Sequence, residues 1–205
     1  MDARDDAPGP AGGGGVPGNG SAGCEGPVAE GRYARVERER RFLMGRAPEP
    51  AAAVTVRSIT DRYLDGTRLR LRYVQHLDGR REFKLTQKIP AGRPGPVQGL
   101  ITNTYLSADE YRVLAALPGA LLAKRRWSVP PLGVDVFEGA LRGLVLAEVE
   151  FADDVEAAAF TPPPGSVAEV TDDQRFTGGR LVRTARPELL RWMAGFGLDA
   201  DTAAR

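Results

Sequence analysis

This chain of 205 residues contains a single cysteine, Cys24, and a single histidine, His76. One cysteine cannot form a disulfide within the chain, and the sequence has no Cys/His cluster of the kind that binds zinc. It has no run of 18 apolar residues, and its first residues lack the basic-then-apolar order of a signal peptide. These absences predict a cytoplasmic, reducing setting and no membrane partner.

The chain also lacks an excess of charge of one sign. Lys and Arg total 28 and Asp and Glu total 27, which gives a formal net charge of +1. A nucleic-acid-binding domain usually carries a clear basic excess, so this balance argues against a nucleic-acid partner. Any separation of charge has to be local, within what the length predicts to be one domain with a sizeable core.

Large apolar side chains are scarce in residues 1–31, which consist mainly of Gly, Ala, Pro and acidic residues. Such a segment cannot bury enough apolar surface to offset its ordering entropy, so we expect a disordered tail. The glycine run at 12–15 lacks the strand, the Gly-Lys-Ser/Thr and the helix of a phosphate-binding loop. We therefore expect the folded domain over residues 32–205.

Alternation of apolar and polar residues dominates the sequence after residue 32 and predicts strands. The expected strands cover 33–43, 54–63, 68–75, 81–89, 98–106, 120–129, 133–138 and 144–151. Asp65-Gly66 and Asp78-Gly79 separate alternating runs and favour hairpins. Helices are expected at 107–117, 153–159 and 186–196. This pattern predicts an α+β fold, mainly β: an eight-stranded antiparallel closed barrel with a few packing helices.

Acidic residues repeat on one face of the first and last of these strands. Because side chains alternate across a strand, Glu37, Glu39 and Arg41 share a face, and so do Glu148 and Glu150. Like-charged carboxylates on one face are costly unless a cation lies between them. Hard divalent cations prefer oxygen ligands, so this pattern indicates a metal site.

The middle strands carry basic residues in the same alternating way. These are Arg68, Arg70, Arg72, Lys84, Lys88, Lys124 and Arg126. For any single strand, a polar face exposed to water is the simpler interpretation. Taken together, the strands favour a barrel closed with the charges inward, in which Asp135 joins the four glutamates. Acids on one side of a hydrated lumen and bases on the other suit a metal and a polyphosphate chain.

These segments also resemble a known family in order and spacing. Residues 37–43, Glu-Arg-Glu-Arg-Arg-Phe-Leu, resemble the N-terminal ExExK signature of the CYTH superfamily, the triphosphate tunnel metalloenzymes. Arg41 stands where that family usually has lysine. Further similar segments follow in the family's order at 63–65, 70–72, 85–88, 124–126, 135–137, 148–151 and 169–176. The resemblance covers about 33–185.

The resemblance implies an eight-stranded tunnel that binds a triphosphate-containing substrate with Mg²⁺ or Mn²⁺. The metal ligands would come from Glu37, Glu39, Asp135, Glu148 and Glu150. The phosphates would be bound by Arg41, Arg70, Arg72, Lys88, Lys124 and Arg126. Catalysis would involve Glu37, Glu39 and Glu150, and Lys84 lies on the same face outside the matched motifs.

The expected activity is metal-dependent hydrolysis of inorganic triphosphate or a related organic triphosphate. The alternatives are an adenylate cyclase of the same superfamily, a non-catalytic polyphosphate- or nucleotide-binding module, and a structural β domain with its charges in solvent. A wall that carries Leu69, Leu71, Val149 and Phe151 outward needs a cover. That cover could be helices or a second copy of the chain, so a homodimer is a further expectation.

Overall fold

The computed structural model describes residues 33–199, so the tail expected at 1–31 lies outside the described residues, as do 32 and 200–205. Nine strands are present in the described range. They are Arg35–Met44 (β1), Thr55–Leu64 (β2), Leu69–His76 (β3), Arg81–Pro90 (β4), Val97–Leu106 (β5), Gly119–Val129 (β6), Leu132–Phe137 (β7), Val145–Glu150 (β8) and Ser166–Glu169 (β9).

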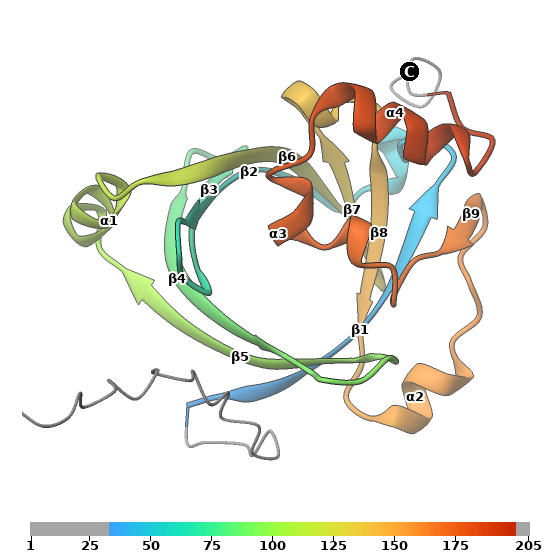
Figure 1. Cartoon of the computed structure of the whole chain (residues 1–205), viewed down its shortest axis with the longest axis horizontal. Helices are drawn as coiled ribbons and strands as arrows, with labels where there is room; N and C mark the ends of the chain where they lie inside the picture. Colours follow the sequence, from blue (N-terminus) through green and yellow to red (C-terminus); the bar gives the residue numbers. More distant parts are fainter. Residues whose placement is uncertain (1–32, 200–205) are drawn as a thin grey trace, which may run out of the picture.

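The first eight strands close into an antiparallel barrel. Their order is β5-β4-β3-β2-β6-β7-β8-β1, and pairing between β1 and β5 completes the ring (Figure 1). The predicted fold class is therefore confirmed, and each predicted strand end lies within two residues of the observed one. The hairpin turns at Gly66 and Gly79 are also as predicted, with φ angles of 70° and 86° that glycine adopts without strain.

The ninth strand was not predicted. β1 pairs with β5 through residues 35–38, and β9 becomes its partner at residues 42–44, where the pairing with β5 has ended. β9 has only four residues and follows the proline-rich stretch at 162–164, so it shows no alternation long enough to be recognised. Its position depends on the free edge of β1, which is a tertiary feature.

Four α-helices lie outside the ring or at its end. They are Ala108–Ala115 (α1), Asp154–Ala159 (α2), Gly178–Leu181 (α3) and Arg186–Ala194 (α4), with 3-10 helices at Pro50–Ala52, Gly139–Leu141 and Gln174–Phe176. The start of α1 is fixed by a capping box between Ser107 and Glu110. Three of these helices were predicted, and α3 was not. None of the helices in the described range is both long and apolar enough to cross a membrane.

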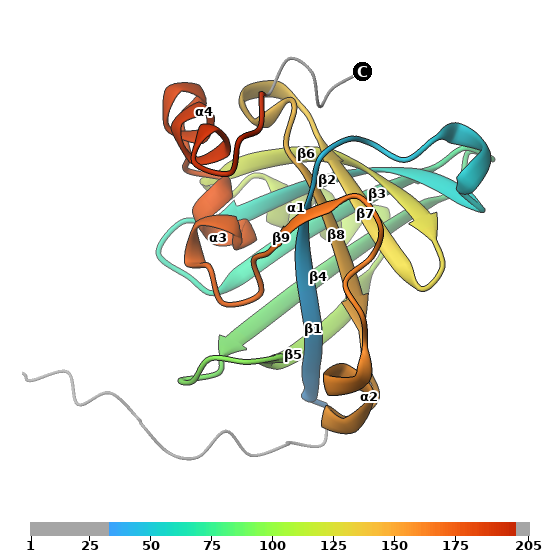
Figure 2. The ribbon, with the colours of Figure 1, turned by 90° about the vertical axis from the view of Figure 1, so that its right-hand side faces the viewer.

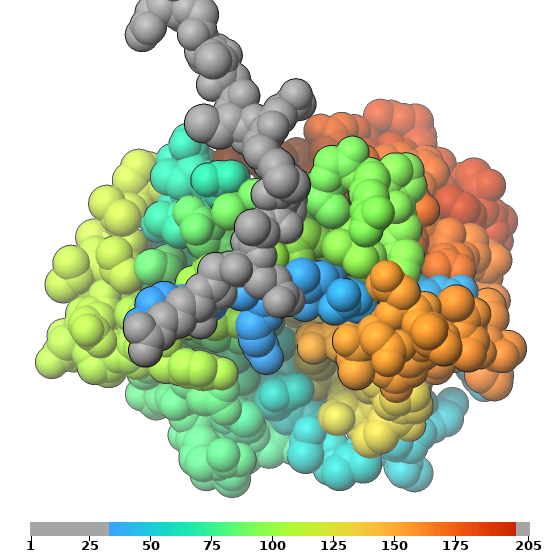
Figure 3. Space-filling view, turned by 90° about the horizontal axis from the view of Figure 1, so that it is seen from below, coloured from blue at the N-terminus to red at the C-terminus, as the bar shows by residue number. Residues whose placement is uncertain are grey.

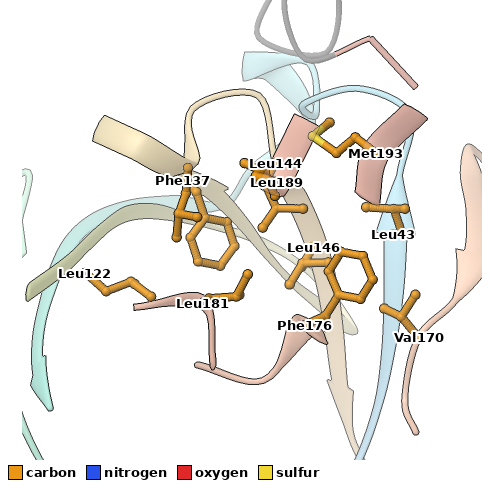
Figure 4. Packing of buried hydrophobic residues seen from close by; sticks show 11 residues of the cluster. Leu43, Leu122, Phe137, Leu144, Leu146, Val170, Phe176, Leu181, Leu189 and Met193 are labelled. Carbon is orange, nitrogen blue, oxygen red and sulfur yellow. The ribbon is translucent and has the colours of Figure 1, made fainter. Parts of the chain in front are cut away.

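The C-terminal segment fills one end of the barrel with apolar side chains. Phe176 and Leu181 lie against Leu122, Phe137 and Leu146, which project from β6, β7 and β8 (Figure 4). We call these five residues the plug cluster. Each is at most 5% exposed, and each borders the barrel cavity. The apolar contacts of the cluster anchor the chain after β9 across the end of the barrel.

A second apolar cluster covers the outside of the wall. Val149 and Phe151 pack with Phe42 and with Ala157 of α2. Figure 2 shows α2 near the lower ends of β1 and β8, and Figure 3 shows α2 in orange beside the start of β1 in blue. Leu71, on the far side of the barrel, is fully buried as well. The chain itself therefore covers three of the four wall residues that suggested a partner, and the homodimer stays a prediction.

Replacing Phe176 tests the plug cluster. Phe176 is 1% exposed, and removing a buried phenyl ring leaves a cavity that the barrel wall can fill only in part. We expect Phe176→Ala to lower the free energy of unfolding by about 3–5 kcal/mol, measured by urea denaturation. Val113→Ala is the control, since Val113 is 72% exposed, and its effect should stay within about 0.5 kcal/mol. Equal effects of the two substitutions would contradict the packing described above.

Candidate functional site

A cavity of about 930 Å³ occupies the interior of the barrel beside the plug cluster. Ten of the eleven residues predicted to form the site border it: Glu37, Glu39, Arg41, Arg70, Arg72, Lys88, Lys124, Arg126, Glu148 and Glu150. The alternation of side chains in closed strands brings them together, because the polar face of each strand points into the lumen. The eleventh residue, Asp135, lies behind this surface.

Arg41 joins the two acidic strands at the centre of the cavity wall. Its Nη2 donates a hydrogen bond to Glu39 Oε1 over 2.5 Å, and its Nε lies 3.4 Å from Glu148 Oε1. This contact follows from register, since Arg41 is the direct cross-strand neighbour of Glu148. The backbone N–H of Arg41 also donates to Thr171 Oγ1, in the turn after β9. The position of Arg41 is therefore set by β8 and by the C-terminal segment together.

Asp135 orients two cations and was expected to bind metal. Both of its oxygens accept hydrogen bonds from Arg126, each over 2.7 Å, and Lys124 forms an ion pair with Oδ2. The side chain of Asp135 is completely buried. Because its oxygens are already engaged and it does not border the cavity, this geometry favours a role in positioning Lys124 and Arg126.

A second buried aspartate, Asp61, was missed by the sequence analysis. It accepts two hydrogen bonds from Arg72, of 2.7 and 2.8 Å, and its Oδ1 lies 3.7 Å from Arg70 Nε. Burial alone would raise the pKa of Asp61, but the attraction of Arg72 and Arg70 outweighs it and holds the pKa well below its usual range. Its position in the sequence could have indicated it. Asp61 shares a strand face with Tyr63 in β2, which pairs with the arginine-rich strand β3.

The pKa values of the two glutamates beside Arg41 shift in opposite directions. Burial and repulsion from Glu148 raise the pKa of Glu39 to about 7, against the opposing attraction of Arg41 and Lys88. Burial would raise the pKa of Glu148 too, but Arg126, Lys124 and Arg41 hold it well below its usual range. Because the Glu148 carboxylate stays charged, its repulsion favours the protonated form of Glu39.

Some donor atoms of the cavity wall have no hydrogen-bond partner among the described residues. Arg41 Nη1 and Arg70 Nε are buried and make no hydrogen bond there, although Arg70 Nε has the 3.7 Å ion pair with Asp61. Buried guanidinium N–H groups without acceptors are costly, and an anion in the cavity would satisfy them. The electrostatics of this wall therefore suit a phosphate-containing ligand.

Carboxylates suitable for a metal face the same cavity. Glu39 is the cross-strand neighbour of Glu150 and is repelled by Glu148 and Glu37, so a divalent cation among them would offset this repulsion. Side-chain contacts compete with this arrangement, since Glu37 Oε2 lies 2.6 Å from the ammonium group of Lys88. Within residues 33–199, no three Asp, Glu, His or Cys side chains are grouped closely enough to hold an ion as they stand. Carboxylate oxygens are the donors that Mg²⁺ and Mn²⁺ prefer, so the donor chemistry of this wall fits either ion.

Comparison with known proteins adds one short sequence match. No protein-family model matches the chain. An inorganic triphosphatase from Nitrosomonas europaea is 51% identical over 48 residues, which are 23% of this chain and 32% of that protein. The matched stretch therefore spans about a third of the length of the curated relative.

Two solved structures overlap much more of the chain at lower similarity. One, described as an inorganic triphosphatase, is 28% identical with a TM-score of 0.49 and covers 73% of this chain and 96% of its own. Another, a putative adenylate cyclase from Vibrio parahaemolyticus, is 11% identical with a TM-score of 0.35 and covers 82% and 93%. Because both TM-scores are below 0.5, the fold rests on the strand pairing of this chain and not on these alignments.

The raised pKa of Glu39 makes stability depend on pH. The unfolded chain releases this proton near the ordinary value of 4.5, whereas the folded chain keeps it up to about pH 7, so stability from this group falls as the pH rises through that window. We expect Glu39→Gln to be more stable than the wild type at about pH 8, by about 1–3 kcal/mol, and the advantage to shrink near pH 5. Urea denaturation at both pH values measures it.

Glu138→Gln is the matched control, because Glu138 is half exposed on the outer wall, paired with Arg125. If Glu39→Gln changed the free energy of unfolding by the same small amount at both pH values, the pKa of Glu39 would not be raised in the folded chain.

Proposed function

We propose that this chain is a metal-dependent phosphohydrolase of the CYTH superfamily, acting on inorganic triphosphate or a related organic triphosphate. The observation that carries this proposal is the barrel cavity, which is bordered by six cations and four glutamates at the predicted positions. The match to an inorganic triphosphatase over 48 residues supports it. The substrate, the metal and a cytoplasmic setting are parts of the proposal.

The cations of the cavity bind and orient the phosphoryl chain in this proposal. Arginine forks suit bidentate contacts with phosphate oxygens, and lysines add point charge. Arg72 and Arg126 are held in fixed positions by Asp61 and Asp135, so their outward N–H groups are oriented before a ligand enters. Such preorganised donors stabilise the charge that develops during phosphoryl transfer.

Glu37, Glu39, Glu148 and Glu150 would hold Mg²⁺ or Mn²⁺. Glu148 would then exchange its contacts with Arg126 and Arg41 for the metal. When bound, the metal supplies charge neutralisation at the phosphoryl oxygens. Asp135 is left out of this ligand set because Lys124 and Arg126 occupy its oxygens. A glutamate at the cavity surface would orient the attacking water and take its proton. As the water oxygen bonds to the terminal phosphorus, the bond from that phosphorus to the bridging oxygen breaks, which gives orthophosphate and leaves pyrophosphate as the leaving group.

Arg41 has a particular part in this scheme, because it lies between two of the expected metal ligands. Its guanidinium contacts Glu39 and approaches Glu148, so metal binding requires these carboxylates to exchange an internal cation for an external one. Release of Arg41 from Glu39 would leave its N–H groups available to phosphate. If this exchange does not occur, the cavity binds polyphosphate without turning it over, which is the principal alternative.

Phosphate release from tripolyphosphate tests the proposed activity. The purified chain is assayed with Mg²⁺, with Mn²⁺ and with EDTA, beside the Glu37→Gln/Glu39→Gln double variant and the Glu138→Gln control. We expect metal-dependent release of orthophosphate that EDTA abolishes and that the double variant loses by roughly 100-fold or more, because it lacks two metal ligands. Glu138→Gln should keep full activity.

The other outcomes distinguish the alternatives. Binding of tripolyphosphate without release would identify a binding module, and release of pyrophosphate from ATP would identify a cyclase. If the chain neither bound tripolyphosphate nor released phosphate from it, that result would contradict the proposal as a whole.

A further inference from the structure

Lys84 differs from the other lysines of the barrel in its surroundings. It lies in the middle of β4, with Arg72 and Tyr105 as its cross-strand neighbours, and it borders the cavity. β4 and β3 lie across the ring from β8, which carries Glu148. Lys84 therefore belongs to the cationic wall that faces the glutamates.

The charges around Lys84 are mostly of its own sign. Arg72 and Arg70 repel it, and Asp61, a carboxylate that attracts it, is already bound by Arg72. Glu82, in the same strand, contacts His76 at 2.6 Å. Among the described residues no carboxylate lies within ion-pair distance of the Lys84 ammonium group, and the ring of Tyr105 is 6.0 Å away.

The other two lysines of the cavity each have a carboxylate. Lys88 pairs with Glu37 and Lys124 pairs with Asp135. Burial, followed by repulsion from Arg72 and Arg70, lowers the pKa of Lys84 to about 8. Lys84 is partly buried, and a partly desolvated ammonium group without a counter-ion lowers stability. An anionic ligand in the cavity would offset this cost.

We propose that Lys84 is a further substrate-binding residue. It contacts a phosphoryl group at the end of the bound tripolyphosphate that lies away from the glutamates. This inference rests on the proposed function and adds a residue outside the motifs that suggested it. Lys84 supplies a point charge beside Arg70, whose Nε is also unsatisfied, so the two together form an anion site on the β3–β4 wall.

Binding and stability measured together test this role. Isothermal titration calorimetry with tripolyphosphate, in EDTA and again in Mg²⁺, compares the wild type with Lys84→Met. We expect the affinity to fall about tenfold or more, while the melting temperature stays unchanged or rises because a partly buried charge without a counter-ion is removed. A residue needed only for folding would lower the melting temperature. Lys84→Gln repeats the measurement with a polar side chain, in case Met packs poorly.

Arg80→Gln is the control for net charge. It removes one positive charge from an exposed hairpin, where Arg80 pairs only with Asp78, so it should leave the affinity within about twofold of the wild type. Unchanged affinity in both Lys84 variants would overturn the inference while the proposed function stands. A wild-type chain that binds tripolyphosphate in neither buffer would overturn the proposed function and this inference with it.

Discussion

The requirement that charges removed from water be paired governs the interior of this barrel. Closing eight strands with their polar faces inward buries several cations and carboxylates in the barrel wall, where an isolated charge is costly. Asp61 and Asp135 meet this requirement on two neighbouring parts of the wall, each holding an arginine by two hydrogen bonds. The cations they hold keep one orientation, which a hydrated, flexible side chain would not.

Two apolar clusters make such a charged lumen possible. The plug cluster closes one end of the barrel with Phe176 and Leu181, and the outer cluster packs Phe42 and Val149 beneath α2. The apolar burial that stabilises the fold thus lies at the end and on the outside of the ring, and the centre is left for a polar ligand. A barrel with a conventional apolar interior would have no room for the 930 Å³ cavity.

Pairing is incomplete at the places that matter for a ligand. Arg41 Nη1 and Arg70 Nε have no hydrogen-bond acceptor within the described range, and Lys84 has no carboxylate. Unpaired polar groups that lower stability are commonly concentrated at functional sites, where a ligand can pair with them. The distribution of paired and unpaired cations therefore separates residues that position the wall from those that are free to bind phosphate.

The sequence by itself determined the eight strands, the two glycine hairpins and the inward face of ten site residues, because alternation and turn chemistry are local properties. The tertiary structure alone decided that β9 and α3 exist, that the plug cluster closes one end, and that Asp135 engages Lys124 and Arg126. It also assigned Asp61 to Arg72, a pairing that needs β2 and β3 in register. The reason is physical: a side chain's face follows from its neighbours in sequence, whereas its partner depends on which strands meet across the closed ring.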